Sequence, residues 1–347
     1  MRKILHIDCD CFFAAVEMRQ NPLLCHIPIA IGGSADRRGV ISTCNYPARE
    51  FGIRSAMSTA MALKKCPHLT LLPGNMALYR EVSQQVMAVI QRYGIAFEQV
   101  SVDEAYVELD PQDSAIDIGH CIRAAVEAEV GITVSVGAAP NKFLAKVASD
   151  WNKPNGLFAV KPHQVNAFVS QLAVRKIPGV GPKTAERLAA KGIETCADAQ
   201  RYSVLELVNE FGRTGMSLYK RSRGEDDRPL ATDRVRKSIS VERTFAHDLL
   251  DANELDEALE GLWDKFVERT EKANIDRLQL APFVKVKFND FSQTTLADQF
   301  QEISLASFRQ LLQQARVRHD PTESRGVRLV GLGGRCPQIS EQQLALF

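Results

Sequence analysis

The spacing of apolar residues divides the first half of the chain into short strands and helices. Residues 2–9 alternate between apolar and polar side chains, as a half-buried strand does, and residues 12–20 follow the helical period. Pro47 in a first turn and Gly52 after it bound another short helix. The same spacing predicts strands at 27–33, 39–45, 69–72, 95–101, 104–109, 132–140 and 156–160, and helices at 55–66, 75–92, 114–130 and 141–151.

The order of these elements predicts the fold class. With residues 11–73 set aside as an insertion, the order is strand, helix, hairpin, helix, strand, which is the ferredoxin-like β-α-β-β-α-β plan with one more strand at its end. Residues 166–230 are predicted to be all-helical, 231–241 to be a polar and basic linker, and 242–335 to form a small α+β domain. The predicted elements of that domain are helices at 251–273 and 304–318 and strands at 283–288 and 325–332. We therefore predict an α+β multidomain protein.

Length and composition are those of a soluble globular protein. The 347 residues, 45% apolar and 24% charged, suit about two to four domains. No apolar run approaches the roughly 18–20 residues of a membrane span, and acids interrupt the apolar N-terminal run, unlike a signal peptide. The eight cysteines form no CxxC pair, as is typical of reduced thiols. We expect a cytoplasmic protein with no membrane segment.

The net charge of +1 is unevenly distributed. Residues 175–223 hold ten Lys or Arg against five acids, and residues 303–335 hold six Arg against two acids. The segment 233–243 is also basic, and Arg236 and Lys237 within it are candidate DNA contacts. Local basic surfaces of this kind can bind a polyanion, although a mixed solvated surface explains each of them about as well.

Two adjacent acids, Asp103 and Glu104, interrupt the apolar pattern of the segment SVDEAYVEL. A strand sends consecutive side chains to opposite faces, so these two share a face only if the chain bends between them. In a ferredoxin-like sheet the first strand can lie beside this hairpin, which would bring Asp8 opposite both acids. Asp10 has the same parity as Asp8 and is a weaker candidate for the same cluster.

Three carboxylates packed together would repel one another unless cations lie between them. Hard divalent ions with oxygen ligands remove that penalty, and two such ions clamp the attacking and leaving oxygens of a phosphoryl transfer. We therefore predict a site for two Mg²⁺ ions, with Mn²⁺ as a substitute, at Asp8, Asp103 and Glu104. The alternative is a pair of turn acids at the end of a hairpin.

Other side chains suit a triphosphate. Tyr46 and Arg49 lie one helical turn apart and can point the same way, and Lys153 follows a helix near the mouth of the sheet. Phe12 and Phe13 follow the first strand directly, so one can pack in the core while the other forms a flat floor under a sugar. Ordinary solvent exposure of the two cations, and burial of both rings, remain open.

The segment RKIPGVGPKTAERL predicts a helix-hairpin-helix. Its Gly179-Val180-Gly181 turn would present backbone N–H groups beside a helix N-terminus, with Lys183 next to them. Such a turn binds a backbone phosphate without reading sequence. A plain loop between two helices is the alternative.

Together these motifs are similar to those of the Y-family DNA polymerases of the bacterial DNA polymerase IV type. The resemblance covers nearly the whole chain, and five segments carry it: HIDCDCFFAAVE, GVISTCNYPAREFGIRSAM, SVDEAY, SVGAAPNKFLAKVASDWNKPNG and KIPGVGPKTAERL. It implies a palm (1–10 and 74–165), small fingers (11–73), a thumb with the helix-hairpin-helix (166–230), a linker (231–241), a little finger (242–335) and a flexible tail (336–347).

The resemblance also implies roles for single residues. Positions that match metal contacts of the family are Asp8, Asp103, Glu104 and the backbone carbonyl of Cys9, and positions that match triphosphate contacts are Thr43, Tyr46, Arg49, Lys153 and Phe12. Phe13 matches the aromatic steric gate that excludes a 2′-hydroxyl, and Ser42 would lie over the nascent base pair. The implied partners are primer-template DNA and deoxynucleoside triphosphates, bound by a monomer.

The implied reaction is template-directed attack of a primer 3′-hydroxyl on the α-phosphate of a deoxynucleoside triphosphate, with release of pyrophosphate. The fingers segment is short and rich in small residues, so it would press weakly on the nascent pair and tolerate damaged templates. We expect error-prone translesion synthesis without proofreading. A nucleotide cyclase and a catalytically inactive DNA-binding scaffold are the rival interpretations.

The last five residues, QLALF, bring the apolar Leu344, Leu346 and Phe347 after a polar stretch. A frayed end or a tail folded onto the little finger is one interpretation. The other is a peptide that docks into a partner, and it resembles the pattern by which bacterial polymerases hold the sliding clamp. In that interpretation the clamp contacts are Gln343, Leu344, Leu346 and Phe347.

Overall fold

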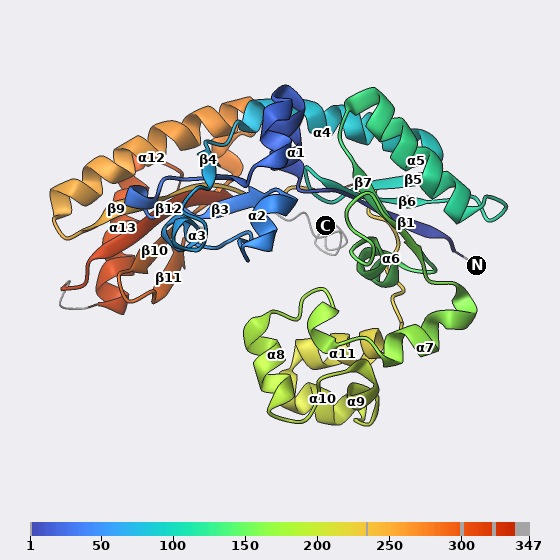
Figure 1. Ribbon diagram of the computed structural model, residues 1–347. Helices are drawn as coiled ribbons and strands as arrows, with labels where there is room; N and C mark the ends of the chain where they lie inside the picture. Colours follow the sequence, from blue (N-terminus) through green and yellow to red (C-terminus); the bar gives the residue numbers. More distant parts are fainter. Residues whose placement is uncertain (1, 234, 299–301, 321–323, 337–347) are drawn as a thin grey trace, which may run out of the picture. The chain divides into compact units, whose positions relative to one another are not determined.

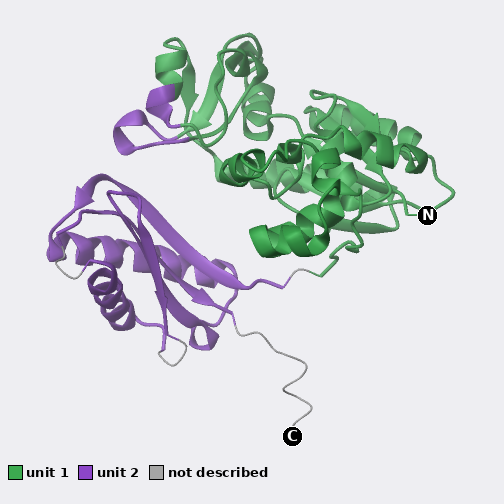
Figure 2. Cartoon of the chain, turned by 90° about the horizontal axis from the view of Figure 1, so that it is seen from below, with its two compact units in different colours: residues 1–32, 41–57, 62–233 green, residues 33–40, 58–61, 234–347 purple. Residues whose placement is uncertain are grey.

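The computed structural model describes residues 2–233, 235–298, 302–320 and 324–336, and Figure 1 shows their helices and strands. The chain divides into two compact units (Figure 2). The first comprises Met1–Gly32, Ile41–Met57 and Ala62–Asp233, and the second comprises Gly33–Val40, Ser58–Met61 and Arg234–Phe347.

A five-stranded sheet in the first unit follows the ferredoxin-like plan. Its strand order is β5-β6-β1-β7-β8, so β1 lies between two antiparallel neighbours and β8 adds a parallel strand at the edge. This order confirms the predicted plan with one more strand at its end. The strands are β1 (Ile4–Cys9), β5 (Ala96–Gln99), β6 (Glu104–Glu108), β7 (Val134–Ala139) and β8 (Leu157–Ala159), and the helices packed on them are α4 (Met76–Ile90), α5 (Ala115–Val130) and α6 (Lys142–Ser149).

Strand β1 sends its side chains alternately to two layers. Leu5 and Ile7 are buried in the core that the sheet shares with α4 and α5, whereas His6 contacts Ser149 of α6. Figure 1 shows α4 and α5 on one side of the sheet and α6 on the other. Because Asp8 has the parity of His6, the apolar alternation of β1 directs this carboxylate to the side of α6.

A three-stranded sheet, β3-β2-β4, lies in the insertion between β1 and α4. The elements of this insertion are α1 (Phe12–Gln20), β2 (Ile29–Gly32), β3 (Ile41–Cys44), α2 (Tyr46–Glu50), α3 (Thr59–Lys65) and β4 (Thr70–Leu72). Asn45 caps α2: its Oδ1 accepts a hydrogen bond from the N–H of Ala48 at 3.1 Å, and its amide donates to the carbonyl of Ile27 at 2.8 Å. This cap determines that the helix begins at Tyr46, a predicted triphosphate contact.

The segment predicted to be all-helical does consist of short helices. They are α7 (Val165–Ser170), α8 (Pro182–Ala189), α9 (Cys196–Gln200), α10 (Val204–Phe211) and α11 (Arg213–Ser222). Leu188 and Leu207 of these helices belong to the same buried core as Phe143 of α6. The helices therefore share an apolar core with the α6 side of the five-stranded sheet.

The second unit holds a four-stranded antiparallel sheet of order β11-β10-β12-β9. Its elements are β9 (Ser238–Leu249), α12 (Ala252–Lys272), β10 (Ala281–Phe288), β11 (Gln293–Ala297), α13 (Leu305–His319) and β12 (Val327–Arg335). Both helices pack into one core with the sheet, where Val284 and Val286 of β10 meet Phe266 and Phe308. The predicted small α+β domain is thus present.

One boundary prediction was wrong. Strand β9 begins at Ser238, inside the segment 231–241 that the sequence predicts to be a linker. Two residues of this edge strand, Ile239 and Phe245, are buried, and most of the others are polar and exposed. An alternation as weak as this one looks like a polar linker in the sequence. The strand forms through its pairing with β12, which its own apolar pattern does not reveal.

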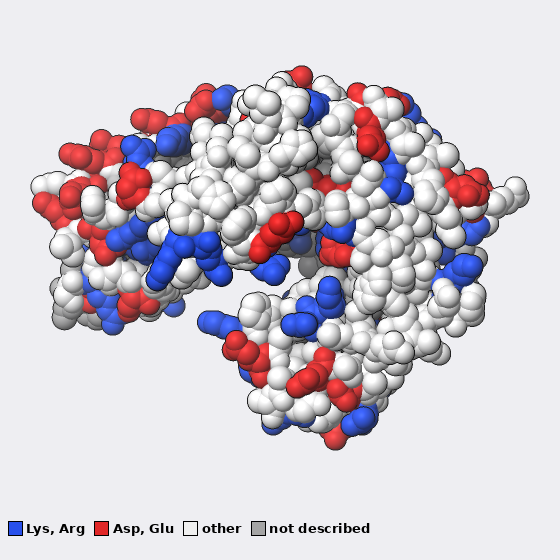
Figure 3. All heavy atoms as spheres, viewed as in Figure 1, with Lys and Arg blue, Asp and Glu red and all other residues white. Residues whose placement is uncertain are grey.

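Charge is distributed in patches, as the sequence indicates. Figure 3 shows Lys and Arg side chains gathered at some places on the face in view and Asp and Glu at others. Helix α12 alone carries seven acids and three basic residues. Among the described residues, no helix is both long and apolar enough to cross a membrane.

Candidate active site

Two of the predicted carboxylates lie opposite each other in neighbouring strands. In the pairing of β1 with β6, Asp8 is directly across from Glu104, although 95 residues separate them in the chain. The ligand atoms of His6, Asp8 and Glu104 lie within 4.8 Å of one another. Asp103 lies at the bend just before β6, where its carbonyl accepts a hydrogen bond from the N–H of Cys9 at 2.9 Å. The bend therefore keeps Asp103 beside the end of β1.

The bend depends on Ser101. Its hydroxyl donates to Asp103 Oδ1 at 2.5 Å and accepts from the backbone N–H of Glu104 at 3.1 Å. The N–H groups of Val100 and Ser101 both donate to the carbonyl of Glu104, which closes the turn. A short polar side chain that bonds its own backbone is a common way to hold a tight turn. The bend leaves Asp103 just outside β6, whose first residue is Glu104.

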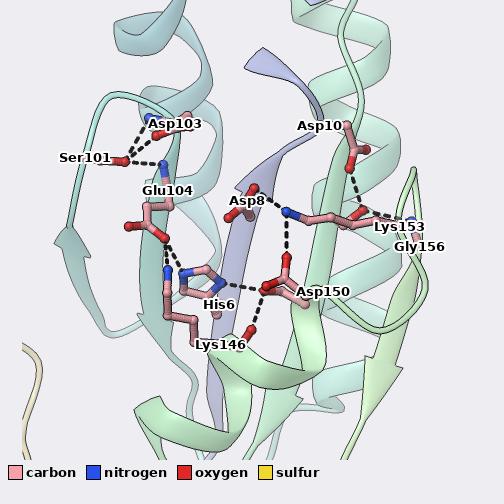
Figure 4. Close-up of polar contacts among 12 residues, drawn as sticks. His6, Asp8, Asp10, Ser101, Asp103, Glu104, Lys146, Asp150, Lys153 and Gly156 are labelled. Atoms are coloured by element: carbon pink, nitrogen blue, oxygen red, sulfur yellow. Dashed lines mark hydrogen bonds and ion pairs between the residues drawn. The ribbon is translucent and has the colours of Figure 1, made fainter. Parts of the chain in front are cut away.

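The carboxylates of Asp8 in β1 and Glu104 in β6 each form an ion pair with a lysine (Figure 4). Lys153 Nζ lies 2.6 Å from Asp8 Oδ1 and 2.8 Å from Asp150 Oδ1. Lys146 of α6 forms an ion pair with Glu104 Oε2. The positive charge thus comes from α6 and from the loop after it, and these lysines neutralise part of the carboxylate cluster.

Glu104 has a second partner in His6. The Nε2 atom of His6 lies 3.1 Å from Glu104 Oε2, and its Nδ1 lies 2.7 Å from the hydroxyl of Ser149. The hydrogen bond from His6, with the charge of Lys146, lowers the pKa of Glu104 to about 2. Burial lowers the pKa of His6. Glu104 is therefore an anion across the neutral pH range, and His6 Nε2 lies within hydrogen-bond distance of it.

Asp8 is in a different electrostatic situation. Burial raises its pKa, and the nearby charge of Lys153 offsets that rise only in part. A carboxylate in this state gains from a further cation. The donors of Asp8, Asp103 and Glu104 are all oxygens, which suits hard ions such as Mg²⁺ and Mn²⁺ rather than ions that prefer sulfur. The residues present therefore fit the predicted metals.

A cavity of about 190 Å³ gathers most of the predicted site residues. Its lining includes nine residues that are candidates from the sequence, together with Cys11 and Ser55; the nine are Asp8, Cys9, Phe12, Phe13, Ser42, Thr43, Arg49, Asp103 and Lys153. Tyr46 lies beside this lining, with the guanidinium of Arg49 at 4.6 Å from its ring centroid. This one cavity is thus lined by residues from β1, α1, β3, α2 and the loop after α6.

The two phenylalanines at the start of α1 have different surroundings. Phe12 is 3% exposed and belongs to the main core. Phe13 is half-buried and stacks on Tyr79 with ring centroids 4.4 Å apart and planes 14° apart. Tyr79 is itself held by a 2.6 Å hydrogen bond to Glu17. Phe13 is therefore a fixed ring at the cavity wall.

The hairpin of the predicted helix-hairpin-helix is open to a ligand. Gly179 has a φ of +96°, and a Cβ placed on Gly179 or Gly181 would meet nothing within 4 Å. Gly181 is the N-cap of α8 and provides no side-chain cap, so the first N–H groups of the helix, including that of Lys183, are left for other partners. The N–H of Val180 is not among them, because it donates to the carbonyl of Ile177 at 3.0 Å.

The remaining candidates lie in the second unit or outside the described residues. Arg236 and Lys237 are exposed in the segment before β9. The four predicted clamp contacts, Gln343, Leu344, Leu346 and Phe347, lie outside the described residues.

Sequence reasoning missed the support under Glu104, which consists of His6, Lys146 and Ser149. The parity of His6 with Asp8 in β1 was a usable signal, since both side chains must face the same layer. Lys146 and Ser149 are one helical turn apart on α6, but nothing in their spacing indicates a carboxylate that lies 42 residues away from Lys146. That contact depends on how α6 packs on the sheet.

Comparison with protein families finds three matches. The impB/mucB/samB family matches residues 7–150, and its C-terminal domain matches residues 236–344. A thumb domain described for DNA polymerase-iota matches residues 175–226.

Relatives and solved structures match along nearly the whole chain. A DNA polymerase IV of Shewanella baltica (strain OS195) is 48% identical over 336 residues, which is 96% of this chain and 93% of the relative. A DNA polymerase IV of Pectobacterium atrosepticum is 47% identical and covers 99% of this chain and 98% of its own length. A Y-family DNA polymerase chimera of Dbh and Dpo4 has a TM-score of 0.87 at 25% identity, and it covers 97% of this chain and 100% of its own. An insertion ternary complex of Dbh DNA polymerase has a TM-score of 0.66 at 25% identity, with the same coverage.

Proposed function

The chain belongs to the impB/mucB/samB family of Y-family DNA polymerases and is a DNA-directed DNA polymerase of the translesion type, and we propose that it works by a two-metal nucleotidyl transfer centred on Asp8, Asp103 and Glu104. The observation that carries this proposal is the register of β1 against β6, which sets Asp8 across from Glu104 beside the bend at Asp103. Lys153 and Arg49 border the same cavity, where a triphosphate needs positive charge.

The family implies dependence on divalent metal ions, and we propose two Mg²⁺ ions per site, with Mn²⁺ as a substitute. Asp8, Asp103 and Glu104 would hold them, with the backbone carbonyl of Cys9 as a further oxygen ligand. When bound, such ions offset the charge that develops on the transferred phosphoryl group. His6 and Lys146 hold the Glu104 carboxylate in place, since both contact its Oε2.

The residues around the cavity have separate tasks in this proposal. Arg49 and Lys153 bind triphosphate oxygens, and Tyr46 and Thr43 donate hydrogen bonds beside them. Phe12 lines the nucleotide site from the core side, and Phe13 meets the sugar at the position of a 2′-hydroxyl. When Lys153 binds a phosphate, its ion pairs with Asp8 and Asp150 break.

We assign DNA binding to helix α8 with its preceding turn and to the second unit. The turn at Gly179 and Gly181, with Lys183, would hold a backbone phosphate at the N-terminus of α8. In the second unit, Lys285 and Lys287 of β10 share the sheet face that does not join the core, and Arg236 and Lys237 precede β9. Contacts of this kind are independent of sequence and weaken with salt.

We further propose a palm of residues 1–10 and 74–165, fingers of 11–73, a thumb of 166–230 and a little finger that starts with β9. The fingers carry small side chains near the nascent pair, with Ser42 over it, so they discriminate weakly between correct and damaged pairs. We propose that synthesis is error-prone and without proofreading, because none of the parts assigned above is an exonuclease.

One assay separates this proposal from its rivals. The protein is incubated with a primed template, Mg²⁺ and the four deoxynucleoside triphosphates, and the primer is followed on a gel. Template-dependent extension supports the polymerase, formation of cyclic nucleotide without DNA supports a cyclase, and DNA binding without any product supports a scaffold. Extension past a damaged template base tests the translesion role.

Deleting residues 343–347 is expected to leave unassisted primer extension unchanged and to abolish stimulation by a sliding clamp. The basis is the apolar QLALF end, which would raise the effective concentration of the enzyme on clamp-loaded DNA by tethering it. Extension rates with and without clamp measure the effect in both proteins. Equal stimulation of the truncated and full-length proteins would show that another surface contacts the clamp.

A further inference from the structure

Asp10 is a buried carboxylate that the reaction proposed above does not use. It follows β1, is 1% exposed, and is not in the cluster formed by His6, Asp8 and Glu104. A buried anion is costly unless donors surround it, so its partners should reveal its role.

Four donors converge on the two oxygens of Asp10. Oδ1 accepts from the hydroxyl of Ser135 at 2.8 Å and from that of Tyr46 at 3.5 Å. Oδ2 accepts from the hydroxyl of Thr133 at 2.9 Å and from the backbone N–H of Asn155 at 2.7 Å. A carboxylate has about four acceptor positions, and here each of them has a donor.

These donors connect Asp10 to the loop that carries Lys153. The N–H of Asn155 bonds Asp10 directly, and the N–H of Gly156 bonds the hydroxyl of Ser135, which in turn donates to Asp10. The dashed lines in Figure 4 follow this path from Asp10 to Gly156. Two consecutive backbone N–H groups after Lys153 are thus tied to one carboxylate.

The loop is also held from the other side. Arg123 of α5 donates to the side-chain oxygen of Asn155, with its Nε at 3.1 Å and Nη2 at 2.8 Å, and Nη2 also donates to the Asn155 carbonyl. Asn155 itself has a φ of +47°, in the left-handed region that asparagine enters more readily than most residues other than glycine. Asp10 and Arg123 together hold Asn155 in this conformation.

The remaining donor, Tyr46, belongs to another element, α2. It begins α2, and its ring lies under the guanidinium of Arg49. Asp10 therefore touches two of the elements that carry proposed triphosphate contacts, the loop after α6 and the start of α2. Because donors occupy all its acceptor positions, Asp10 has no acceptor position left for a further hydrogen bond.

From this geometry we infer that Asp10 is a positioning residue for the triphosphate site, which holds the Lys153 loop and Tyr46 in the arrangement that receives the β- and γ-phosphates. The inference rests on the proposed role of Lys153 at the triphosphate. Asp10 itself touches neither substrate nor metal. A misplacement of about 1 Å at such a site can cost on the order of 100-fold.

The test is a double-mutant cycle with Asp10→Ala, Lys153→Ala and the double variant in the full chain on a primed template. We expect Asp10→Ala to raise the KM for the deoxynucleoside triphosphate roughly tenfold or more, and to change the Kd for primer-template DNA less than about twofold. On the Lys153→Ala background, the same change should raise the KM much less. Asp226→Asn is the matched control, because this carboxylate is also buried and hydrogen-bonded but contacts α6 at its N-terminus.

The outcomes separate the inference from the proposed function. A KM within twofold of the parent value, or an equal rise on both backgrounds, would overturn the positioning role. An unchanged KM in Lys153→Ala would instead show that the assignment of Lys153 is wrong. If Asp10→Ala does not fold, Thr133→Val removes one donor without changing the shape of the side chain. Its expected rise in KM is about threefold, and that rise should vanish on the Lys153→Ala background, whereas its persistence there would again overturn the inference.

Discussion

Alanine at Asp8, Asp103 or Glu104 is expected to slow primer extension by roughly a thousandfold or more, while the affinity for primer-template DNA stays within about threefold. The proposed cations contribute several kcal/mol of charge stabilisation in the transition state, and each step of about 1.4 kcal/mol is a factor of ten in rate. DNA binding is assigned to α8 and to the second unit, which these substitutions do not touch.

Two further variants sharpen this test. Asp110→Ala removes an exposed acid just after β6 and should leave extension unchanged. Glu104→Gln keeps an oxygen that can accept from Lys146 while it removes the charge, so it separates loss of charge from loss of shape. Binding of Mn²⁺ to each variant, followed by electron paramagnetic resonance, reports on the metals independently of turnover. Extension within tenfold of the parent enzyme in any of the three alanine variants would contradict the metal assignment.

Phe13→Val is expected to reduce discrimination against ribonucleotides by roughly 100-fold, which corresponds to about 3 kcal/mol of lost steric exclusion. The stacked contact with Tyr79 fixes the ring at the cavity wall, so it cannot move aside for a 2′-hydroxyl. A shorter side chain leaves room for that hydroxyl. The measurement is the ratio of kcat/KM values for a deoxynucleotide and the matching ribonucleotide.

Phe266→Val is the matched control for this prediction. Phe266 is 0% exposed in the core of the second unit and does not line the cavity, so its truncation should lower the Tm by removing buried apolar contacts without changing the sugar ratio. An unchanged ratio in Phe13→Val, or an equal change in both variants, would mean that the gate lies elsewhere.

The sequence by itself determined most of the elements and the fold class. Apolar alternation and helical periodicity are local properties, so they predicted the ferredoxin-like order and the direction in which β1 sends Asp8. The break in that pattern at Asp103 and Glu104 predicted a bend, and the structure has a turn closed by Ser101 at that place. Family resemblance then supplied roles for residues whose chemistry alone left alternatives open.

Contacts between distant segments were decided only by the tertiary structure. The ion pairs of Lys146 with Glu104 and of Lys153 with Asp8 join residues 42 and 145 positions apart, and they depend on how α6 packs on the sheet. Asp10 shares the parity of Asp8, so pattern alone made it a weaker candidate for the same cluster, yet it accepts hydrogen bonds from four donors, among them the backbone N–H of Asn155 in the loop after Lys153. The extent of β9 was likewise determined by its partner strand β12. Local periodicity determines which face of an element a residue occupies, but which groups meet it there depends on packing across the whole unit.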